Sequence, residues 1–100
     1  MKRKASISHD RALIAEIRRS PELAAEYIRA ALEDADEPRV LLIALRQVAE
    51  AWGGIAKVAE AAGVQRESLY RALSPRGNPR LSTLQAVAKA LGLKLTVDAA

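Results

Sequence analysis

The feature that most constrains the fold of this chain is a pair of short apolar-patterned segments on either side of Gly63. The pattern predicts one helix over residues 55–61 and a second over residues 65–73. Gly63 follows Ala59 by four residues, which places a small side chain at the helix crossing and a glycine where the backbone turns left-handed. This spacing predicts a helix-turn-helix, although an ordinary helical hairpin can share it. The apolar residues expected to lock the pair together are Val58, Ala62, Val64, Leu69 and Ala72.

Three more helices are predicted upstream, over residues 10–19, 21–33 and 38–52. The second follows Ser20, which we expect to be its N-cap, with proline at the first helical position. We expect Trp52, at the end of the third, to lie in the core. The apolar residues expected to face inward are Leu13, Ile14, Ile17, Leu23, Tyr27, Ile28, Ala31, Leu32, Leu41, Leu42, Ile43, Leu45, Val48, Ala49 and Trp52.

Downstream, residues 74–80 are rich in turn-forming residues and predict a loop. Ser82 and Gln85 form a capping-box pattern for a last helix that ends at Gly92. Residues 93–97 then alternate apolar and polar, which predicts a short strand. Because the chain offers no second strand, we expect this one to pair with its copy in a homodimer, unless it folds over its own domain. The expected dimer-strand residues are Leu93, Leu95 and Val97.

These elements together predict an all-α fold of five to six helices, with an N-terminal helical extension and a short C-terminal β-strand. We expect residues 1–37 to form the extension and residues 38–100 the helix-turn-helix domain, in one compact unit overall. Alanine supplies 21 of the 100 residues and phenylalanine none, so the helices must pack closely.

The composition excludes several classes of protein. There is no cysteine and the one histidine is His9, so thiolate or histidine metal sites and cysteine nucleophiles are not expected. No carboxylate stands beside a nucleophile or base in a recognisable motif, so we expect no enzyme activity and no cofactor. No apolar run is long enough to cross a bilayer, which favours a cytoplasmic protein without a membrane partner.

The charge is divided unevenly along the chain. The net charge of +4 resides entirely in residues 53–100, with seven Lys and Arg against three Asp and Glu. Residues 5–52 carry a net charge of −3. The basic half can neutralise DNA phosphates, whereas the acidic half can meet a basic protein partner.

The polar residues of the second short helix are of the types that contact base edges in the DNA major groove. The candidates for base contact are Gln65, Arg66, Glu67, Ser68 and Arg71. The candidates for phosphate contact are Gly54, Tyr70, Arg76, Asn78 and Arg80. Alternatives stay open at three kinds of position. The arginines can belong to a solvated face, Glu67 can complement the helix dipole, and Tyr70 can pack at the helix flank.

Residues 52–97 resemble the lambda-repressor-like helix-turn-helix of HigA-type antitoxins, and more narrowly the group called probable addiction module antidote proteins. The resemblance rests on RESLYRALS, GNP and ALGLKLTV, with SPELAAEYIRAALEDADEP and LLIALRQVAEAWGG upstream. It implies the antitoxin of a type II toxin–antitoxin module, which represses its own promoter by binding operator DNA and neutralises a RelE/ParE-like toxin. The group often has serine where this chain has Gln65, so the operator sequence is not inherited from the resemblance.

Two other functions remain open. One is a stand-alone phage-type transcriptional repressor without a toxin. The other is a helical protein-interaction module that has the helix-turn-helix shape without DNA binding. The salt dependence of DNA binding separates the module from both DNA binders, and the neighbouring gene separates antitoxin from repressor.

Overall fold

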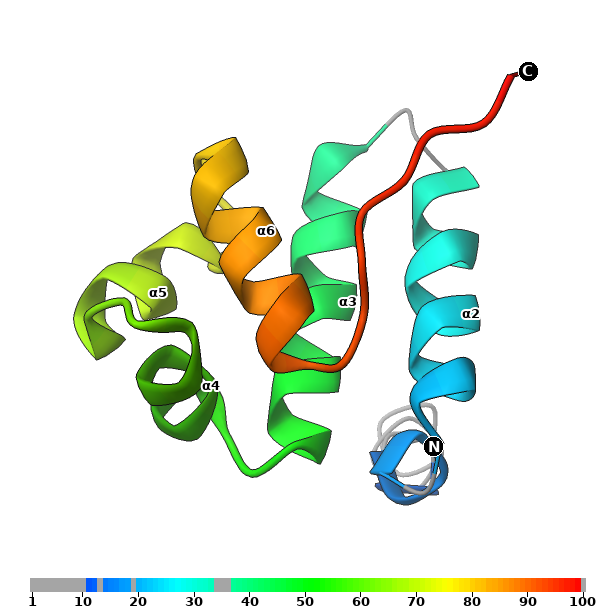
Figure 1. The fold of residues 1–100 in the computed structure, drawn as a ribbon, viewed down its shortest axis with the longest axis horizontal. Helices are drawn as coiled ribbons and strands as arrows, with labels where there is room; N and C mark the ends of the chain where they lie inside the picture. The colour runs from blue at the N-terminus through cyan, green and yellow to red at the C-terminus, as the bar shows by residue number, and fades with distance from the viewer. Residues whose placement is uncertain (1–10, 13, 19, 34–36, 100) are drawn as a thin grey trace, which may run out of the picture.

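A central helix organises the molecule in the computed structural model, which describes residues 11–12, 14–18, 20–33 and 37–99. This helix, α3 (Pro38–Ala51), has α2 (Pro21–Glu33) against one side. On the other side lie α4 (Ile55–Ala62), α5 (Arg66–Ala72) and α6 (Leu81–Ala90), as Figure 1 shows. Residues 11–12 and 14–18 are also helical and lie beside the start of α2. The prediction of an all-helical fold is therefore confirmed for the described residues.

Local signals in the sequence explain where most helices begin and end. The Ser20 hydroxyl accepts a hydrogen bond from the Leu23 amide at 3.4 Å, which is the predicted N-cap of α2. The capping box at Ser82 is wrong, because α6 begins at Leu81 and has Arg80 as its N-cap. The Arg80 carbonyl already accepts a hydrogen bond from the Leu84 amide at 3.0 Å, so the helical ladder starts before Ser82.

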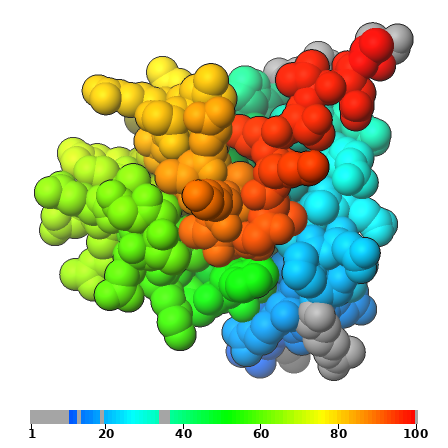
Figure 2. All heavy atoms as spheres, viewed as in Figure 1, coloured from blue at the N-terminus to red at the C-terminus, as the bar shows by residue number. Residues whose placement is uncertain are grey.

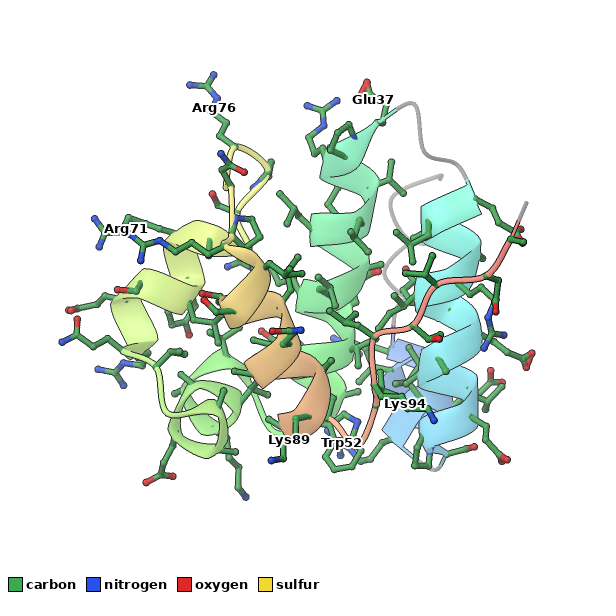
Figure 3. All side chains as sticks on the ribbon, turned by 45° about the horizontal axis from the view of Figure 1, so that its top comes forward. Glu37, Trp52, Arg71, Arg76, Lys89 and Lys94 are labelled. Atoms are coloured by element: carbon green, nitrogen blue, oxygen red, sulfur yellow. The ribbon has the colours of Figure 1, made fainter. Side chains whose placement is uncertain are left out.

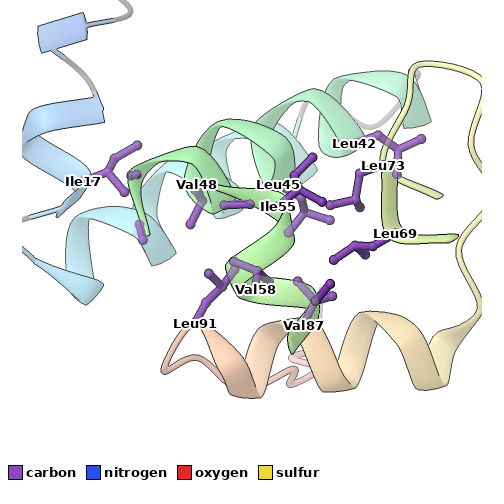
Figure 4. Packing of buried hydrophobic residues seen from close by; sticks show 14 residues of the cluster. Ile17, Leu42, Leu45, Val48, Ile55, Val58, Leu69, Leu73, Val87 and Leu91 are labelled. Carbon is purple, nitrogen blue, oxygen red and sulfur yellow. The ribbon is translucent and has the colours of Figure 1, made fainter. Parts of the chain in front are cut away.

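One buried cluster joins the N-terminal helices to the helices around Gly63. Ile17 is 1 % exposed and Ala24 is 0 % exposed, and both belong to the same cluster as Val48, Leu69 and Leu91. Figure 4 shows Ile17 beside the N-terminal helices, and Val48, Leu69 and Leu91 in the rest of the cluster. A hydrogen bond also joins the two parts, because Nε of Arg18 donates to the carbonyl of Ala51, at the end of α3, at 2.9 Å. The division of the chain at residue 37 stays a prediction.

Some of the predicted core positions lie at the surface instead. The set of apolar residues predicted to face inward on each helix is wider than the side that is buried, because a helix buries only the arc that meets a neighbour. On α2 the inward arc is centred on Ala24, which leaves side chains on both flanks in solvent. Trp52 follows α3 as its C-cap, outside the regular helix, so its placement in the core is wrong. The exposed fractions are 40 % for Leu23, 50 % for Leu32, 43 % for Ile43 and 39 % for Trp52.

The predicted C-terminal strand is absent. Residues 93–99 form no strand in the described part of the chain. The Leu93 amide donates to the Ala88 carbonyl at 2.8 Å, which ties the start of this tail to α6. Figures 1 and 2 show the tail running over the surface between α6 and α2. The physical reason is that a β-ladder needs a second strand, and the described part of the chain supplies none.

Candidate nucleic-acid interface

The turn between α4 and α5 has the geometry that the spacing predicts. Gly63 has φ 73° and ψ 29°, a left-handed conformation that favours glycine. Its neighbour Val64 donates an amide hydrogen bond to the Ala59 carbonyl at 3.0 Å, which closes the C-terminal end of α4. Ala59 is 1 % exposed at the crossing of the helices. Both helices lie within one residue of their predicted starts and ends.

Helix α5 buries one side and exposes the polar residues of the other. Leu69 is 0 % exposed and Leu73 is 1 % exposed, so they hold α5 against the core. All five residues predicted to contact bases are exposed, and the structure brings them together on this one short element. Gln65 is the N-cap, and its side chain makes no capping hydrogen bond, so its amide is available to an external ligand.

The loop between α5 and α6 folds back onto the end of α5. The Ser74 hydroxyl donates to the Arg71 carbonyl at 2.8 Å, and the Gly77 amide donates to the Ser74 carbonyl at 2.8 Å. An open hollow of about 350 Å³ lies between loop and helix. A second hollow continues toward the start of α6 and includes Thr83. The first hollow is lined by Ser68, Arg71, Ala72, Arg76, Gly77 and Asn78.

Figure 3 shows Arg71 on the outer side of α5 and Arg76 at the tip of the following loop. Arg76, Asn78 and Arg80 are all exposed, as expected of residues that contact phosphate. Among the described residues, one ion pair is seen. It joins Arg39 on α3 to Glu37 just before this helix, with 3.7 Å between Nη2 of Arg39 and Oε2 of Glu37. The guanidinium groups of α5 and its loop are thus not neutralised by a described carboxylate, and residues 64–80 present a net charge of +3.

Tyr70 has a neighbour that the sequence analysis missed. The guanidinium carbon of Arg46, on α3, lies 5.7 Å from the centre of the Tyr70 ring, a cation–π distance. The ring therefore packs at the flank of α5, while 41 % of the residue stays exposed. Arg46 adds a further positive charge beside α5. No local sequence signal could have paired these residues, because 24 positions separate them.

Gly54 does not join the other predicted phosphate contacts. It is the N-cap of α4, with φ 102°, in the connection from α3. Figure 1 shows this connection below α4, apart from the loop between α5 and α6. The Gly54 amide also donates to the Ala49 carbonyl at 2.9 Å, so it is not available to a phosphate.

Other kinds of site are not seen among the residues that the structure describes. No group of three or more His, Cys, Asp or Glu side chains is placed to hold a metal ion there. None of the described helices combines the length and apolar character needed to span a membrane. His9 lies outside the described residues.

Comparison with known proteins gives a family for nearly the whole chain. A family model described as probable addiction module antidote protein matches residues 9–99. An uncharacterized protein of Haemophilus influenzae is 39 % identical over 72 residues, which are 72 % of each chain. No solved structure matches the chain.

Proposed function

Since the chain belongs to the family of probable addiction module antidote proteins, we propose that it is the antitoxin of a type II toxin–antitoxin module. In this proposal it binds its own operator DNA as a repressor and neutralises a RelE/ParE-like toxin. Membership of the family implies a toxin partner of some kind. The protein acts by binding, without catalysis and without a cofactor.

The observation that carries DNA binding is the exposed, un-neutralised set of polar and cationic side chains on α5 and its loop. Helices α4 and α5 act as a helix-turn-helix, in which the second helix enters the major groove. Arg66, near the N-terminal end of α5, is placed to contact guanine through its two-pronged guanidinium. Arg76 and Arg80 hold phosphates on one flank of the groove, and the open amides of the first turn of α4, which follow Gly54, hold them on the other.

Operator recognition requires a homodimer in this proposal. A dimer places two recognition helices about 34 Å apart, one turn of DNA, on a palindromic site. The C-terminal tail supplies part of the contact, because Leu95 and Val97 lie in solvent, whereas Leu93 packs against the core. Leu95 is 51 % exposed and Val97 is 93 % exposed. Burying them against a second copy removes apolar surface from water.

The acidic half of the chain faces the toxin. Glu22, Glu26 and Glu33 follow one another along the exposed side of α2, with Arg29 among them. The toxin implied by the resemblance is basic because it acts on nucleic-acid targets, so this side attracts it electrostatically. The same helix packs on α3 through its other side, and scaffold and docking roles are therefore compatible.

A protein-interaction module without DNA binding is the second candidate. It is favoured by the exposed apolar side chains of Leu23, Leu32, Ile43, Leu95 and Val97, which suit contact with another protein. A stand-alone repressor is the third, and the neighbouring gene distinguishes it from an antitoxin. A basic toxin of similar size encoded beside this gene supports the antitoxin, and its absence supports the repressor.

The test of DNA binding is a titration of the full chain with a duplex from the region upstream of its own gene. A scrambled duplex of equal length serves as the control. The proposal expects a clear preference for the upstream duplex, and Arg66→Ala should remove much of that preference. Binding to neither duplex at low salt would favour the protein-interaction module.

A further inference from the structure

Gly77, in the α5–α6 loop, lies close against the end of α5. A Cβ atom added there would lie 2.0 Å from the Ala72 carbonyl oxygen and 2.6 Å from the Arg71 carbonyl oxygen. Both neighbours are backbone atoms, which cannot move aside as a flexible side chain could. Gly77 is not among the glycines with positive φ, so the requirement is for space and not for an unusual backbone angle.

This close approach builds the hollow between helix and loop. Arg76, Gly77 and Asn78 from the loop line this hollow together with Ser68, Arg71 and Ala72 from α5. The residues that line it include two arginines, a serine and an asparagine, and no acidic residue is among them. The hollow is shallow and open to solvent, so a phosphate group can approach it from outside. Such a lining suits a phosphate group.

We propose that this hollow holds one phosphate of the DNA backbone, gripped by Arg71 from the helix and Arg76 from the loop, with Gly77 as the positioning residue. The proposal rests on the DNA binding proposed above. It changes the expected role of Arg71 from base contact to phosphate contact. Arg71 is the last but one residue of α5, whereas base edges are contacted by the N-terminal residues of a recognition helix. Ser68, which lines the same hollow, contributes its hydroxyl to the phosphate.

The variants to compare are Arg71→Ala, Arg76→Ala and Gly77→Ala, with Arg29→Ala on the exposed side of α2 as the matched control. Affinity is measured for the upstream duplex and the scrambled duplex over a series of salt concentrations. Arg71→Ala and Arg76→Ala should each weaken binding to both duplexes about equally, by roughly tenfold. Each should also reduce the slope of log affinity against log salt, and the variant that carries both changes should lose about 0.9 in all, the contribution of the one phosphate that they share. The control should change neither quantity.

Gly77→Ala should lower the salt slope as Arg76→Ala does, although it removes no charge. A merely structural role would lower the melting temperature without changing this slope. The variant that combines Arg76→Ala with Gly77→Ala provides the second test. Once Gly77→Ala has displaced the loop, adding Arg76→Ala should change DNA affinity and the salt slope little further. An equal effect of Arg76→Ala in both backgrounds would overturn the positioning role.

Three outcomes separate the proposals. If the unmodified protein binds neither duplex, the proposed DNA binding fails and this site fails with it. If it binds but Arg71→Ala weakens only the upstream duplex, Arg71 contacts a base and only the phosphate site is wrong. Inorganic phosphate is added to the DNA-free protein as a separate arm. If it binds at the hollow while Gly77→Ala leaves DNA affinity unchanged, the hollow is a site for a free anion and the DNA assignment is overturned.

Discussion

Helices α2 and α5 both pack on the same buried cluster, yet they present opposite chemistry to solvent. Helix α5 is held by Leu69, with 0 % exposure, and carries arginines on its exposed side. Helix α2 is held by Ala24, also with 0 % exposure, and carries glutamates on its exposed side. The buried sides of the two helices determine the fold, and the exposed sides determine which partner each helix can meet. This difference suits one small protein that binds both DNA and a basic toxin.

The largest effect should come from the buried side of α5. Leu69→Ala should reduce the free energy of unfolding by about 2–5 kcal/mol, because it leaves a cavity in the core. The exposed Leu23 on α2 is the matched control, and Leu23→Ala should change the free energy by less than about 0.5 kcal/mol. Denaturant unfolding followed by circular dichroism measures both. Equal losses would mean that α2 buries Leu23 in a contact beyond the single chain.

Removing the tail should separate dimer formation from folding. A chain ending at Leu93 loses Leu95 and Val97 but keeps the Leu93 amide contact with Ala88. We expect light scattering to show a monomer, with affinity for the upstream duplex reduced roughly a hundredfold because two half-sites are no longer linked. Binding to scrambled DNA should fall far less. A dimer that survives the truncation would place the interface elsewhere.

Reversing the charge of α2 should weaken binding of the toxin and leave binding of DNA nearly unchanged. The triple change Glu22→Lys, Glu26→Lys and Glu33→Lys should weaken binding of the neighbouring toxin by tenfold or more, chiefly through slower association. DNA affinity should rise slightly, if it changes at all, because the net charge becomes more positive. Surface plasmon resonance with each partner gives both values. Unchanged toxin binding would make α2 a scaffold only.

The smallest effect is expected at the turn between α4 and α5. Gly63→Ala should cost roughly 1–2 kcal/mol, all of it from the left-handed backbone, since an added Cβ at Gly63 would meet nothing within 4 Å. Gly63→Asn should cost less, because asparagine tolerates this conformation better. Thermal unfolding ranks the two variants. The contrast with Gly77 is instructive, because there the cost of a Cβ comes from contact and not from the backbone angle.

The sequence predicted the local features of this fold better than its contacts. Gly63 and Ser20 act through neighbours close in sequence, so the turn and the start of α2 could be predicted. The exposure of Ile43 and Trp52 depends on which arc of α3 meets another helix, and an apolar stripe does not reveal this. The strand at residues 93–97 was predicted from alternation, but a strand also needs a partner.

The candidate site shows the same division. The exposed polar residues of α5 follow from the position of Leu69 within a helical pattern. The Arg46–Tyr70 contact and the approach of Gly77 to Ala72 could not be predicted, because each depends on how distant or irregular segments meet.

The most direct test of DNA binding is the affinity for the upstream duplex as a function of salt concentration. The arginines of each protomer hold two phosphates, one shared by Arg71 and Arg76 and one held by Arg80, which predicts a slope of log affinity against log salt of about −1.8 per protomer. Arg66→Ala should leave this slope unchanged while it lowers the preference over scrambled DNA. A slope near zero, with equal affinity for both duplexes, would contradict the account.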